Sequence, residues 1–390
     1  MMHTKVAIIG AGPAGLALSR MLHLSGVENV VLECKSRAHV EGRIRAGVLE
    51  QGSVDFLSGI GVGMRMRREG LREDGVCLAV DGDLFRIDLN ALSGRPMVVY
   101  GQTEITKDLI DALAAEDHGP IFGAGQVTLH DVDGGAPHVT FAVEGRAMRL
   151  DCTFVAGCDG FHGTCRQHIP EIAAHEQSYP FGWLGILADV APCHSELVYS
   201  NHRRGFALAS MRSRTRSRYY IQVPAGERLE EWPDDRLWDE LALRLGPTLA
   251  ARMERGPALE KSIAALRSFV AEPMQYGRLF LAGDAAHIVP PTGAKGLNLA
   301  LHDARLLGEA LIAHFRNGSE AALASYSKRA LARVWKAQRF SWWLTKLMHR
   351  FPDASTFERQ IQLAELDYLR RSPAAQKSFA ENYVGSGLEG

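Results

Sequence analysis

The chain has 390 residues, 46% of them hydrophobic and 23% charged, with a formal net charge of -1. This length suits two domains that share a core, and a charge near zero argues against a general attraction to nucleic acid or to anionic membranes. The apolar runs have the length of strands, so we expect no membrane-spanning helix.

The first residues and the cysteines bear on location. A strand begins almost at the first residue, which leaves no room for a signal peptide. The six cysteines are few for this length and show no framework spacing, which favours reduced thiols. We therefore expect a cytoplasmic protein.

Residues 4–34 predict a strand, a glycine turn, a helix and a second strand. The apolar run Val6–Ile9 is the first strand, a helix runs from Pro13 to about His23, and the second strand ends at Glu33. Proline suits the first helical turn, where its missing N–H costs nothing.

The turn between them carries the spacing Gly10-x-Gly12-x-x-Gly15. The first glycine permits the tight turn, the second lets backbone approach a pyrophosphate, and the third lets helix pack on strand. The helix N-terminus adds N–H donors and a positive dipole end, and Glu33 lies where an acid hydrogen-bonds an adenosine ribose. The unit predicts a bound dinucleotide.

Residues 76–100 and 180–265 alternate in the manner of strands, most clearly over Arg218–Val223. Arginines at 212, 214, 216 and 218 would form one basic face on an unbroken strand, which suggests nucleic acid. However, residues 212–215 resemble a hairpin turn between strands Phe206–Met211 and Arg216–Val223, which scatters these side chains. Aromatic interleaving is also missing, so we do not expect nucleic-acid binding.

Two further strand ends carry an acid beside a glycine: Val155 to Gly160, and Leu281 to His287. An Asp after a strand can accept from cofactor hydroxyls or form an Asx turn. Near the first, Cys158, His162, Cys165 and His168 do not match the paired ligand spacing of zinc sites, so we expect no metal.

From Gly293 onward the pattern is mostly helical, with one helix over Ala294–Ile312 and another region over Glu320–His349. The fold class we predict is mixed α/β, with a Rossmann-like dinucleotide-binding domain interleaved with a β-sheet substrate domain, plus C-terminal helices. The expected boundaries are 1–75, 100–180 and 267–300 for the first domain, 76–99 and 181–266 for the second, and 301–390 for the helical region.

These motifs resemble the flavoprotein aromatic hydroxylases, the class A single-component monooxygenases. Longer strings make the resemblance specific to members that act on 4-hydroxybenzoate, and it extends from the first strand to Asn382-Tyr383-Val384-Gly385. The strings are residues 42–52 (GRIRAGVLEQG), 100–104 (YGQTE) and 290–298 (PPTGAKGLN).

The resemblance implies FAD as cofactor, NADPH or NADH as cosubstrate, and O2. The implied reaction inserts one oxygen atom ortho to the phenol through a flavin C4a-hydroperoxide, giving 3,4-dihydroxybenzoate. The residues implied for FAD are Gly10, Gly12, Gly15, Glu33, Arg43, Arg45, Gln102, Asp159, Gly160, Arg218, Gly283, Asp284, Lys295, Leu297 and Asn298. Lys295 could act on the reduced flavin through its charge or be a solvated surface lysine.

The resemblance also implies the substrate site. Arg212 would clamp the carboxylate together with Ser210 and Tyr220, because a guanidinium presents a fork of donors that suits a carboxylate. Tyr199 and Tyr383 would relay the phenolic proton as hydrogen-bonded hydroxyls. The implied pocket walls are Val48, Leu197, Leu208 and Trp183, with Pro291 beside both substrate and flavin.

At two places the sequence departs from the family's pattern, which limits what the resemblance implies there. Glu73 occupies the position where the family's proton relay commonly ends in a histidine, so we expect a shifted pH profile for phenol deprotonation; an unchanged profile in Glu73→His would count against this. The segment after Glu33 lacks the arginine that NADPH-preferring relatives carry there. NADPH remains our expectation, with NADH possible, through Lys35, Arg37, Arg45, His162, Arg166 and Arg267.

Alternatives remain open at this point. A related para-substituted or polyhydroxylated benzoate could be the substrate, or the chain could be a flavin-binding redox sensor. A sensor needs neither a carboxylate clamp nor relay tyrosines, which favours an enzyme. The aromatic residues of 339–348 fit a helical core or a subunit interface, and we favour a homodimer.

Overall fold

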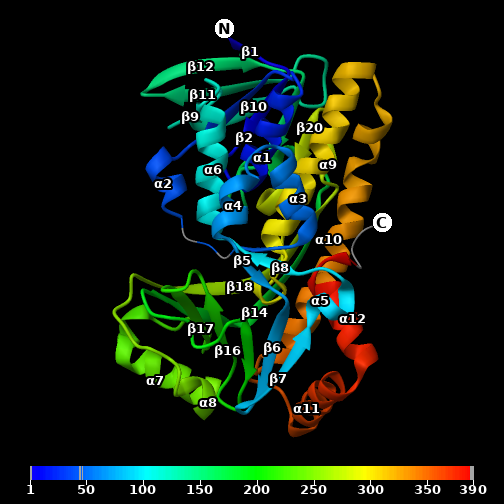
Figure 1. Cartoon of the computed structure of the whole chain (residues 1–390). Helices are drawn as coiled ribbons and strands as arrows, with labels where there is room; N and C mark the ends of the chain where they lie inside the picture. Colours follow the sequence, from blue (N-terminus) through cyan, green and yellow to red (C-terminus); the bar gives the residue numbers. More distant parts are fainter. Residues whose placement is uncertain (1, 44, 46, 387–390) are drawn as a thin grey trace.

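A six-stranded, mostly parallel sheet forms the centre of the upper lobe in Figure 1, in the order β19-β20-β13-β2-β3-β9. The computed structural model describes residues 2–43, 45 and 47–386. The strands are β2 (Val6–Ile9), β3 (Asn29–Glu33), β9 (Ile121–Phe122), β13 (Phe154–Gly157), β19 (Gln275–Tyr276) and β20 (Leu279–Leu281). Every residue of β2 and β13 is buried, as expected for continuous apolar runs covered on both faces.

Two smaller sheets flank this lobe. One has the order β1-β12-β11-β10 and the other β4-β8-β5. Their strands are β1 (Met2–His3), β10 (Gly125–His130), β11 (His138–Val143), β12 (Arg146–Asp151), β4 (Val48–Leu49), β5 (Leu71–Glu73) and β8 (Met97–Val99). The second sheet lies where the two lobes meet in Figure 1.

An eight-stranded sheet forms the lower lobe, in the order β21-β18-β14-β17-β16-β15-β6-β7. Its strands are β6 (Gly75–Val80), β7 (Asp83–Asp88), β14 (Ala173–Ala188), β15 (Val198–Asn201), β16 (Ala207–Met211), β17 (Ser217–Pro224), β18 (Glu260–Glu272) and β21 (His287–Ile288). The predicted hairpin is confirmed, because the N–H groups of Arg212 and Ser213 both donate to the carbonyl oxygen of Arg216.

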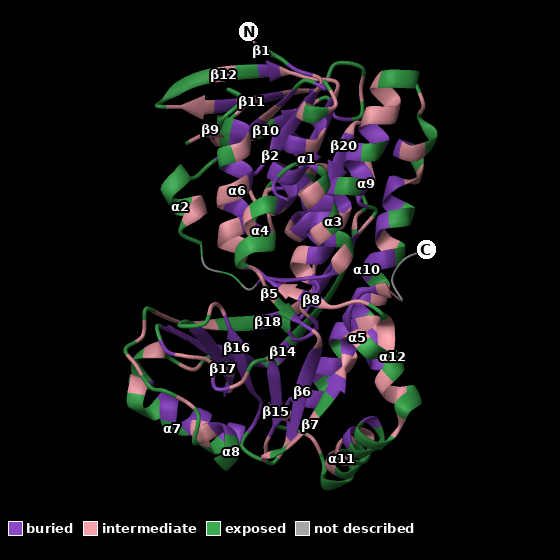
Figure 2. Ribbon diagram, viewed as in Figure 1, coloured by how far each residue is buried: buried purple, intermediate pink, exposed green. Residues whose placement is uncertain are grey.

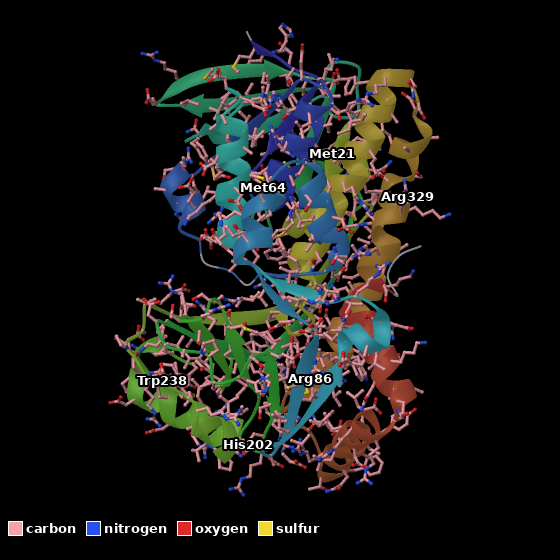
Figure 3. The ribbon with its side chains drawn as sticks, viewed as in Figure 1. Met21, Met64, Arg86, His202, Trp238 and Arg329 are labelled. Atoms are coloured by element: carbon pink, nitrogen blue, oxygen red, sulfur yellow. The ribbon has the colours of Figure 1, made fainter. Side chains whose placement is uncertain are left out.

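The two faces of this sheet have different coverings, because successive side chains point to opposite sides. On one face Leu184, Ile221 and Tyr219 pack against helix α7 (Asp234–Leu245), whose Trp238 is labelled in Figure 3. The Tyr219 ring meets that of Trp238 edge-on at 5.4 Å. On the other face Leu208 and Tyr199 pack against the C-terminal helices. The second face is the one that carries the expected substrate residues.

Helices of the first half surround the six-stranded sheet and its junction with the lower lobe. They are α1 (Pro13–Leu24), α2 (Arg37–Glu41), α3 (Gln51–Gly59), α4 (Gly63–Glu69), α5 (Leu89–Ser93) and α6 (Gln102–Ala114), with the short 3-10 turn η1 (Cys165–His168). The predicted unit of strand, helix and strand over 4–34 is confirmed, with α1 one residue longer than expected.

The second half adds α7 (Asp234–Leu245) and α8 (Pro247–Ala250) to the lower lobe, then α9 (Gly296–Asn317), α10 (Ala321–Met348), α11 (Thr356–Arg371) and α12 (Pro373–Tyr383). The 3-10 turns are η2 (Leu229–Glu231), η3 (Gly283–Ala285) and η4 (Pro291–Gly293). Figure 2 shows that α9 and α10 turn buried faces toward the rest of the protein.

The helix predicted from Ala294 starts two residues later. Ala294 has a φ of 53°, the left-handed conformation, which a right-handed helix cannot include. The helix also runs beyond the predicted Ile312 to Asn317, where Gly318 ends it in the left-handed region.

The mixed α/β architecture is confirmed. The proposed domain boundaries at 180/181 and 266/267 fall inside β14 and β18, so these long strands connect the two lobes. Over the described part of the chain, no helix is both long and apolar enough to cross a membrane.

Candidate active site

The glycine turn between β2 and α1 is shaped from both sides. A Cβ on Gly10 would lie 2.3 Å from the Cys158 carbonyl oxygen, and one on Gly15 would lie 2.1 Å from the Gly10 oxygen. A Cβ on Gly12, in contrast, would meet no described atom within 4 Å. Protein packing explains the first and third glycines, whereas the second borders open space at the N-terminus of α1, as a pyrophosphate site requires.

Glu33 lies at the end of β3 and is buried. Its Oε2 accepts the N–H of Ala11 at 2.8 Å, and its Oε1 accepts the N–H of Lys35 at 2.8 Å. Oε1 also accepts the Cys34 thiol at 3.5 Å, so the acid fixes the glycine turn while Oε2 keeps a lone pair for a further donor.

Asp159 follows β13 and offers a free acceptor. Its Oδ2 accepts the N–H of Cys165 at 2.9 Å, whereas its buried Oδ1 has no partner within the described residues. A Cβ on the adjacent Gly160 would meet open space. This orphaned oxygen fits a hydroxyl donor such as a cofactor would supply.

Asp284 lies in η3 between the two lobes, and its Oδ2 is 3.8 Å from the Arg45 guanidinium. Burial, followed by the charge of Arg45, lowers the pKa of Arg43. The string 42–52 thus meets the Gly283-Asp284 motif, although Ile44 and Ala46 of that string lie outside the described residues. Gln102, another residue expected to contact FAD, is the first residue of α6 and is half-buried.

Lys295 is fully buried, so the alternative of a solvated surface lysine is wrong. Its Nζ donates to Glu50 Oε1 at 2.6 Å and to the Tyr383 carbonyl oxygen at 2.7 Å. Arg333 donates to the other oxygen of Glu50 at 2.6 Å. Burial lowers the pKa of Lys295, and Glu50 opposes that effect. Two cations thus share one carboxylate beside the end of α12.

The side-chain amide of Asn298 uses all of its hydrogen-bonding capacity within the protein. Its Oδ1 accepts the N–H of Glu50 and the hydroxyl of Ser53, and its Nδ2 donates to the carbonyl oxygens of Val48 and Ala294. An amide has two donors and two acceptor sites, so all are used. The proposed FAD contact at Asn298 is thereby restricted to its backbone; its neighbour Leu297 is half-buried.

The expected substrate residues share one face of the eight-stranded sheet. Tyr199, Leu208, Tyr220 and Gly185 are successive cross-strand partners, which makes them one row. The neighbouring positions of the same face belong to Ser210, Arg218, Leu197 and Trp183, and Val48 packs into this cluster from β4. Pro291 is the first residue of η4, and its side chain is exposed.

Tyr199 and Tyr383 form a buried hydroxyl pair 3.0 Å apart. The Tyr199 hydroxyl also donates to the Thr292 carbonyl oxygen at 2.9 Å. Burial raises the pKa of both tyrosines well above the ordinary value. At neutral pH both are therefore neutral hydroxyls that can pass a proton along but not hold a charge.

Arg212 follows β16 and carries an unused donor. Its Nη1 lies 3.5 Å from the Ser210 hydroxyl, and its buried Nε has no partner among the residues that the structure describes. Burial lowers the pKa of Arg212, but a guanidinium stays charged at any physiological pH. Arg218 is paired instead, with Glu260 at 3.0 and 3.3 Å, and its guanidinium lies over the Tyr220 ring.

The side chain of Glu73, at the end of β5, is buried and accepts one hydrogen bond within the described chain. Its Oε1 accepts the N–H of Leu197 at 3.1 Å, and its Oε2 lacks a partner in the described chain. Burial, with help from the charge of Glu196, raises the pKa of Glu73 to about 8. The carboxyl group is therefore mostly protonated at neutral pH.

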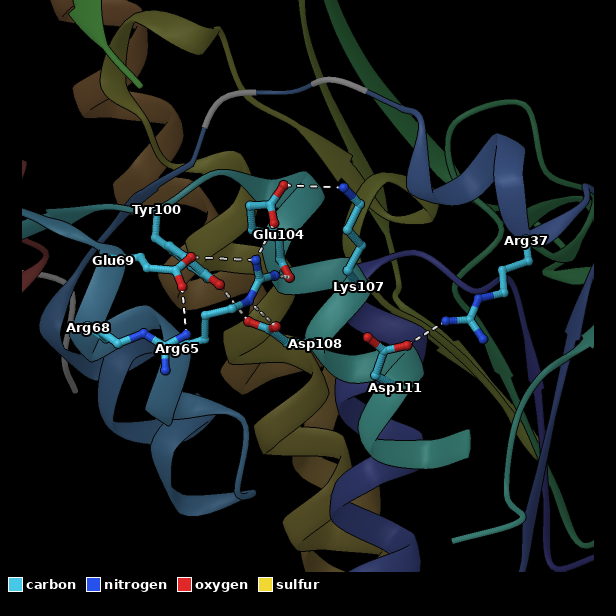
Figure 4. A network of polar contacts seen from close by, with 9 residues as sticks. All are labelled: Arg37, Arg65, Arg68, Glu69, Tyr100, Glu104, Lys107, Asp108 and Asp111. Atoms are coloured by element: carbon cyan, nitrogen blue, oxygen red, sulfur yellow. Dashed lines mark hydrogen bonds and ion pairs between the residues drawn. The ribbon is translucent and has the colours of Figure 1, made fainter. Parts of the chain in front are cut away.

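Five of the six residues proposed for the nicotinamide coenzyme fall into two groups, and the sixth, Arg45, faces Asp284. Arg166 and Arg267 stack on Phe161, and His162 meets the same ring edge-on at 5.1 Å. Lys35 and Arg37 lie on another segment, where Arg37 pairs with Glu41 at 2.6 Å and with Asp111 at 2.5 Å (Figure 4).

Sequence reasoning missed several residues that shape the site. Thr292 supplies the carbonyl oxygen that Tyr199 uses, and Glu50 joins Lys295 to Arg333. Buried His349 accepts from the indole of Trp183 at 2.7 Å. Thr292 and Glu50 lie inside the strings that carried the resemblance, but their roles depend on contacts with residues 93 to 283 positions away in the sequence.

Comparison with known proteins agrees with this geometry. Residues 3–341 match the family described as "FAD binding domain". The chain is 53% identical, over 98% of its length and 96% of the relative's, to a protein of Acinetobacter baylyi named p-hydroxybenzoate hydroxylase.

The chain belongs to the FAD-binding family. A further relative, a 3-(3-hydroxy-phenyl)propionate/3-hydroxycinnamic acid hydroxylase of a Mycobacterium species, is 26% identical over 80% of this chain and 54% of its own. Among solved structures, p-nitrophenol 4-monooxygenase from Pseudomonas putida has a TM-score of 0.84 at 19% identity, covering 100% of this chain and 99% of its own. That likeness shows a shared fold.

Proposed function

We propose that this member of the FAD-binding family is a monooxygenase that hydroxylates 4-hydroxybenzoate at C3, using NAD(P)H and O2, and releases 3,4-dihydroxybenzoate. The main support is a buried guanidinium nitrogen, Nε of Arg212, without a partner among the described residues, on the sheet that also carries Tyr199, whose neutral hydroxyl pairs with that of Tyr383 on α12. The 53% identity to a p-hydroxybenzoate hydroxylase supports the same substrate.

The spacing of residues on this sheet suits a short, rigid ligand with a carboxylate at one end and a hydroxyl at the other. Ser210 is two residues along β16 from Leu208, which pairs with Tyr199, and this step is about 7 Å. A carboxylate bound by Arg212 and Ser210 would direct the para hydroxyl of a benzoate toward Tyr199. The apolar side chains of Val48, Leu197 and Leu208 would exclude water from the ring between them.

The proton has a defined path at its start. Tyr199 gives its hydrogen to the Thr292 carbonyl oxygen, so its oxygen is an acceptor for Tyr383 and for a substrate phenol. A phenol becomes electron-rich when its proton leaves, which prepares the ring for oxygen insertion. Glu73, with a pKa of about 8, can exchange a proton near neutral pH beside Leu197, a residue of that face.

FAD, when bound, supplies the electrons taken from NAD(P)H and activates O2. Gly12, Asp159 and Asp284 would hold it, because open space and unused acceptors coincide at these residues. We propose Arg166, Arg267 and His162 for the nicotinamide coenzyme, with Lys35 and Arg37 for a 2′-phosphate.

We further propose a homodimer in the cytoplasm. Phe357, Ile361 and Tyr368 leave apolar side chains exposed along α11, a surface that a second copy could cover. All six cysteines are free thiols, which agrees with a reducing compartment.

The test is turnover by purified, FAD-loaded protein. NADPH oxidation should rise strongly when 4-hydroxybenzoate is added, with 3,4-dihydroxybenzoate formed in equal amount. Benzoate, which keeps the carboxylate but lacks the phenol, should give no hydroxylated product. No stimulation, or stimulation that yields peroxide alone, would contradict the proposal and favour a redox sensor or another benzoate as substrate.

A further inference from the structure

A buried carboxylate and imidazole lie beneath the turn that carries Asp284. Asp303 of α9 is fully buried, and its Oδ2 lies 2.6 Å from Nε2 of His287. The same oxygen accepts the backbone N–H of Gly283 at 2.9 Å. One carboxylate oxygen thus holds the first and the last residue of the segment 283–287.

The pair is more than a neutral hydrogen bond. Burial disfavours the imidazolium form of His287, but the Asp303 carboxylate outweighs it and holds the pKa of His287 above its ordinary value. Hydrogen bonds between charged partners are shorter and stronger than neutral ones. The other oxygen of Asp303 has no partner in the part of the chain described, so the two contacts carry the whole interaction.

The backbone of the turn is also held elsewhere, whereas Asp284 is not. The Ala286 N–H donates to the Gly283 oxygen at 2.8 Å, and Arg166 donates to the Ala285 oxygen at 2.8 Å. Gly283 has a φ of 63° and lies close to Ala14 of α1. The Asp284 side chain, in contrast, faces Arg45 at 3.8 Å and is about half exposed.

We propose that Asp303 and His287 are positioning residues for FAD: they fix the turn of residues 283–287 so that the Asp284 carboxylate is in place before the cofactor arrives. This inference rests on the FAD site proposed above. A turn that is already ordered loses less conformational freedom on binding, and affinity rises accordingly.

Titration of apoprotein with FAD, followed by flavin fluorescence, tests the proposal. Asp303→Asn and His287→Gln should each raise the FAD dissociation constant by about 10- to 100-fold, the range expected when a hydrogen bond to a charged group is weakened. Asp284→Ala should raise it as well. Tyr326→Phe is the matched control, because it removes a buried hydrogen bond to the Leu281 carbonyl oxygen without touching the turn.

Two further readouts separate positioning from general damage. Tyr326→Phe should lower the melting temperature of the apoprotein but leave FAD affinity unchanged. Once saturated with FAD, Asp303→Asn and His287→Gln should bind 4-hydroxybenzoate as the unaltered protein does, because three strands of the sheet separate β21, which carries His287, from β16, which carries Ser210 of the clamp.

The outcomes are distinct. If Asp284→Ala weakens FAD while Asp303→Asn and His287→Gln leave it unchanged, the positioning role is wrong and the FAD site stands. If Asp284→Ala also has no effect, the turn does not bind FAD and the inference falls with the site. Should Asp303→Asn fail to fold, His287→Gln decides the question by the same measurement.

Discussion

The Tyr199 hydroxyl donates its single hydrogen to the Thr292 carbonyl oxygen, which makes Tyr383 the donor in the 3.0 Å contact between the two tyrosines. The direction of this chain matters, because it leaves the Tyr199 oxygen as the acceptor nearest the proposed clamp. To pass a phenolic proton on to Tyr383, Tyr199 must first turn its own O–H from the Thr292 carbonyl oxygen toward Tyr383, whose O–H must then donate elsewhere.

The first prediction concerns these two hydroxyls. Tyr199→Phe should lower substrate-stimulated turnover by about 100-fold, the lower range for loss of a positioned proton-transfer group. Tyr383→Phe should have a smaller effect, because Tyr199 keeps its bond to Thr292. Product formation by FAD-loaded protein is the measurement. Tyr219→Phe, equally buried on the opposite face of the same sheet, is the control and should retain activity.

A second prediction concerns the carboxylate clamp. Arg212→Met should weaken 4-hydroxybenzoate binding by about 100-fold or more, since unpairing a buried charge costs roughly 3–5 kcal/mol. Arg212→Lys should be intermediate, because an ammonium lacks the planar fork of donors. Binding is measured by the change in flavin absorbance. Arg216→Met, whose exposed side chain pairs with Asp189, is the control, and equal losses in both variants would refute the clamp.

Glu73 makes the third prediction, on stability. Its pKa is about 8 in the folded protein against 4.5 for an ordinary glutamate, so between these pH values the folded state binds more protons than the unfolded state. Stability contributed by this group is therefore lost as pH rises from about 4.5 through 8. Glu73→Gln cannot ionise, so the variant does not lose this stability as the pH rises.

Urea unfolding at pH 5 and pH 8.5 measures the effect. The free energy of unfolding of Glu73→Gln should exceed that of the unaltered protein by a margin that grows to a few kcal/mol at the higher pH. Exposed Glu144→Gln should show no such growth. A margin that stays constant with pH would mean that Glu73 titrates normally.

The fourth prediction concerns coenzyme choice. Asp111 and Glu41 occupy the Arg37 guanidinium, so Asp111→Asn should free it for a 2′-phosphate. The ratio of kcat/KM for NADPH over NADH should rise by about two- to fivefold, since exposed ion pairs are worth roughly 0.2–1 kcal/mol. Asp108→Asn, which alters the Arg65 network on the same helix, should leave the ratio unchanged (Figure 4).

Local spacing predicted the local parts of this structure well. The unit of β2, α1 and β3, the hairpin before β17 and the helix α10 all depend on residues close in sequence, and each is found within one or two residues of its expected bounds. The predicted start of α9 failed for a local reason too, since Ala294 adopts a conformation that alanine rarely takes.

Contacts across the chain escaped prediction. Lys295 at a helix start has the pattern of a solvated residue, and its burial depends on Glu50, 245 positions away. Asn298 likewise contacts Val48 and Glu50, which lie 250 and 248 positions away in the sequence. No periodicity encodes such pairs, because they are set by how α9 packs against β4 and the start of α3.

Helix α10 has a consequence of its own. It is 28 residues long, or about 42 Å. Near its start Tyr326 donates to the Leu281 carbonyl oxygen of the upper sheet, and at its end Asn201 of the lower sheet donates to Leu347. If either sheet unfolds, one end of α10 loses its contacts while the other end stays bound to the remaining sheet. Denaturation should accordingly be cooperative across both lobes, with tryptophan fluorescence and far-ultraviolet circular dichroism reporting one shared transition.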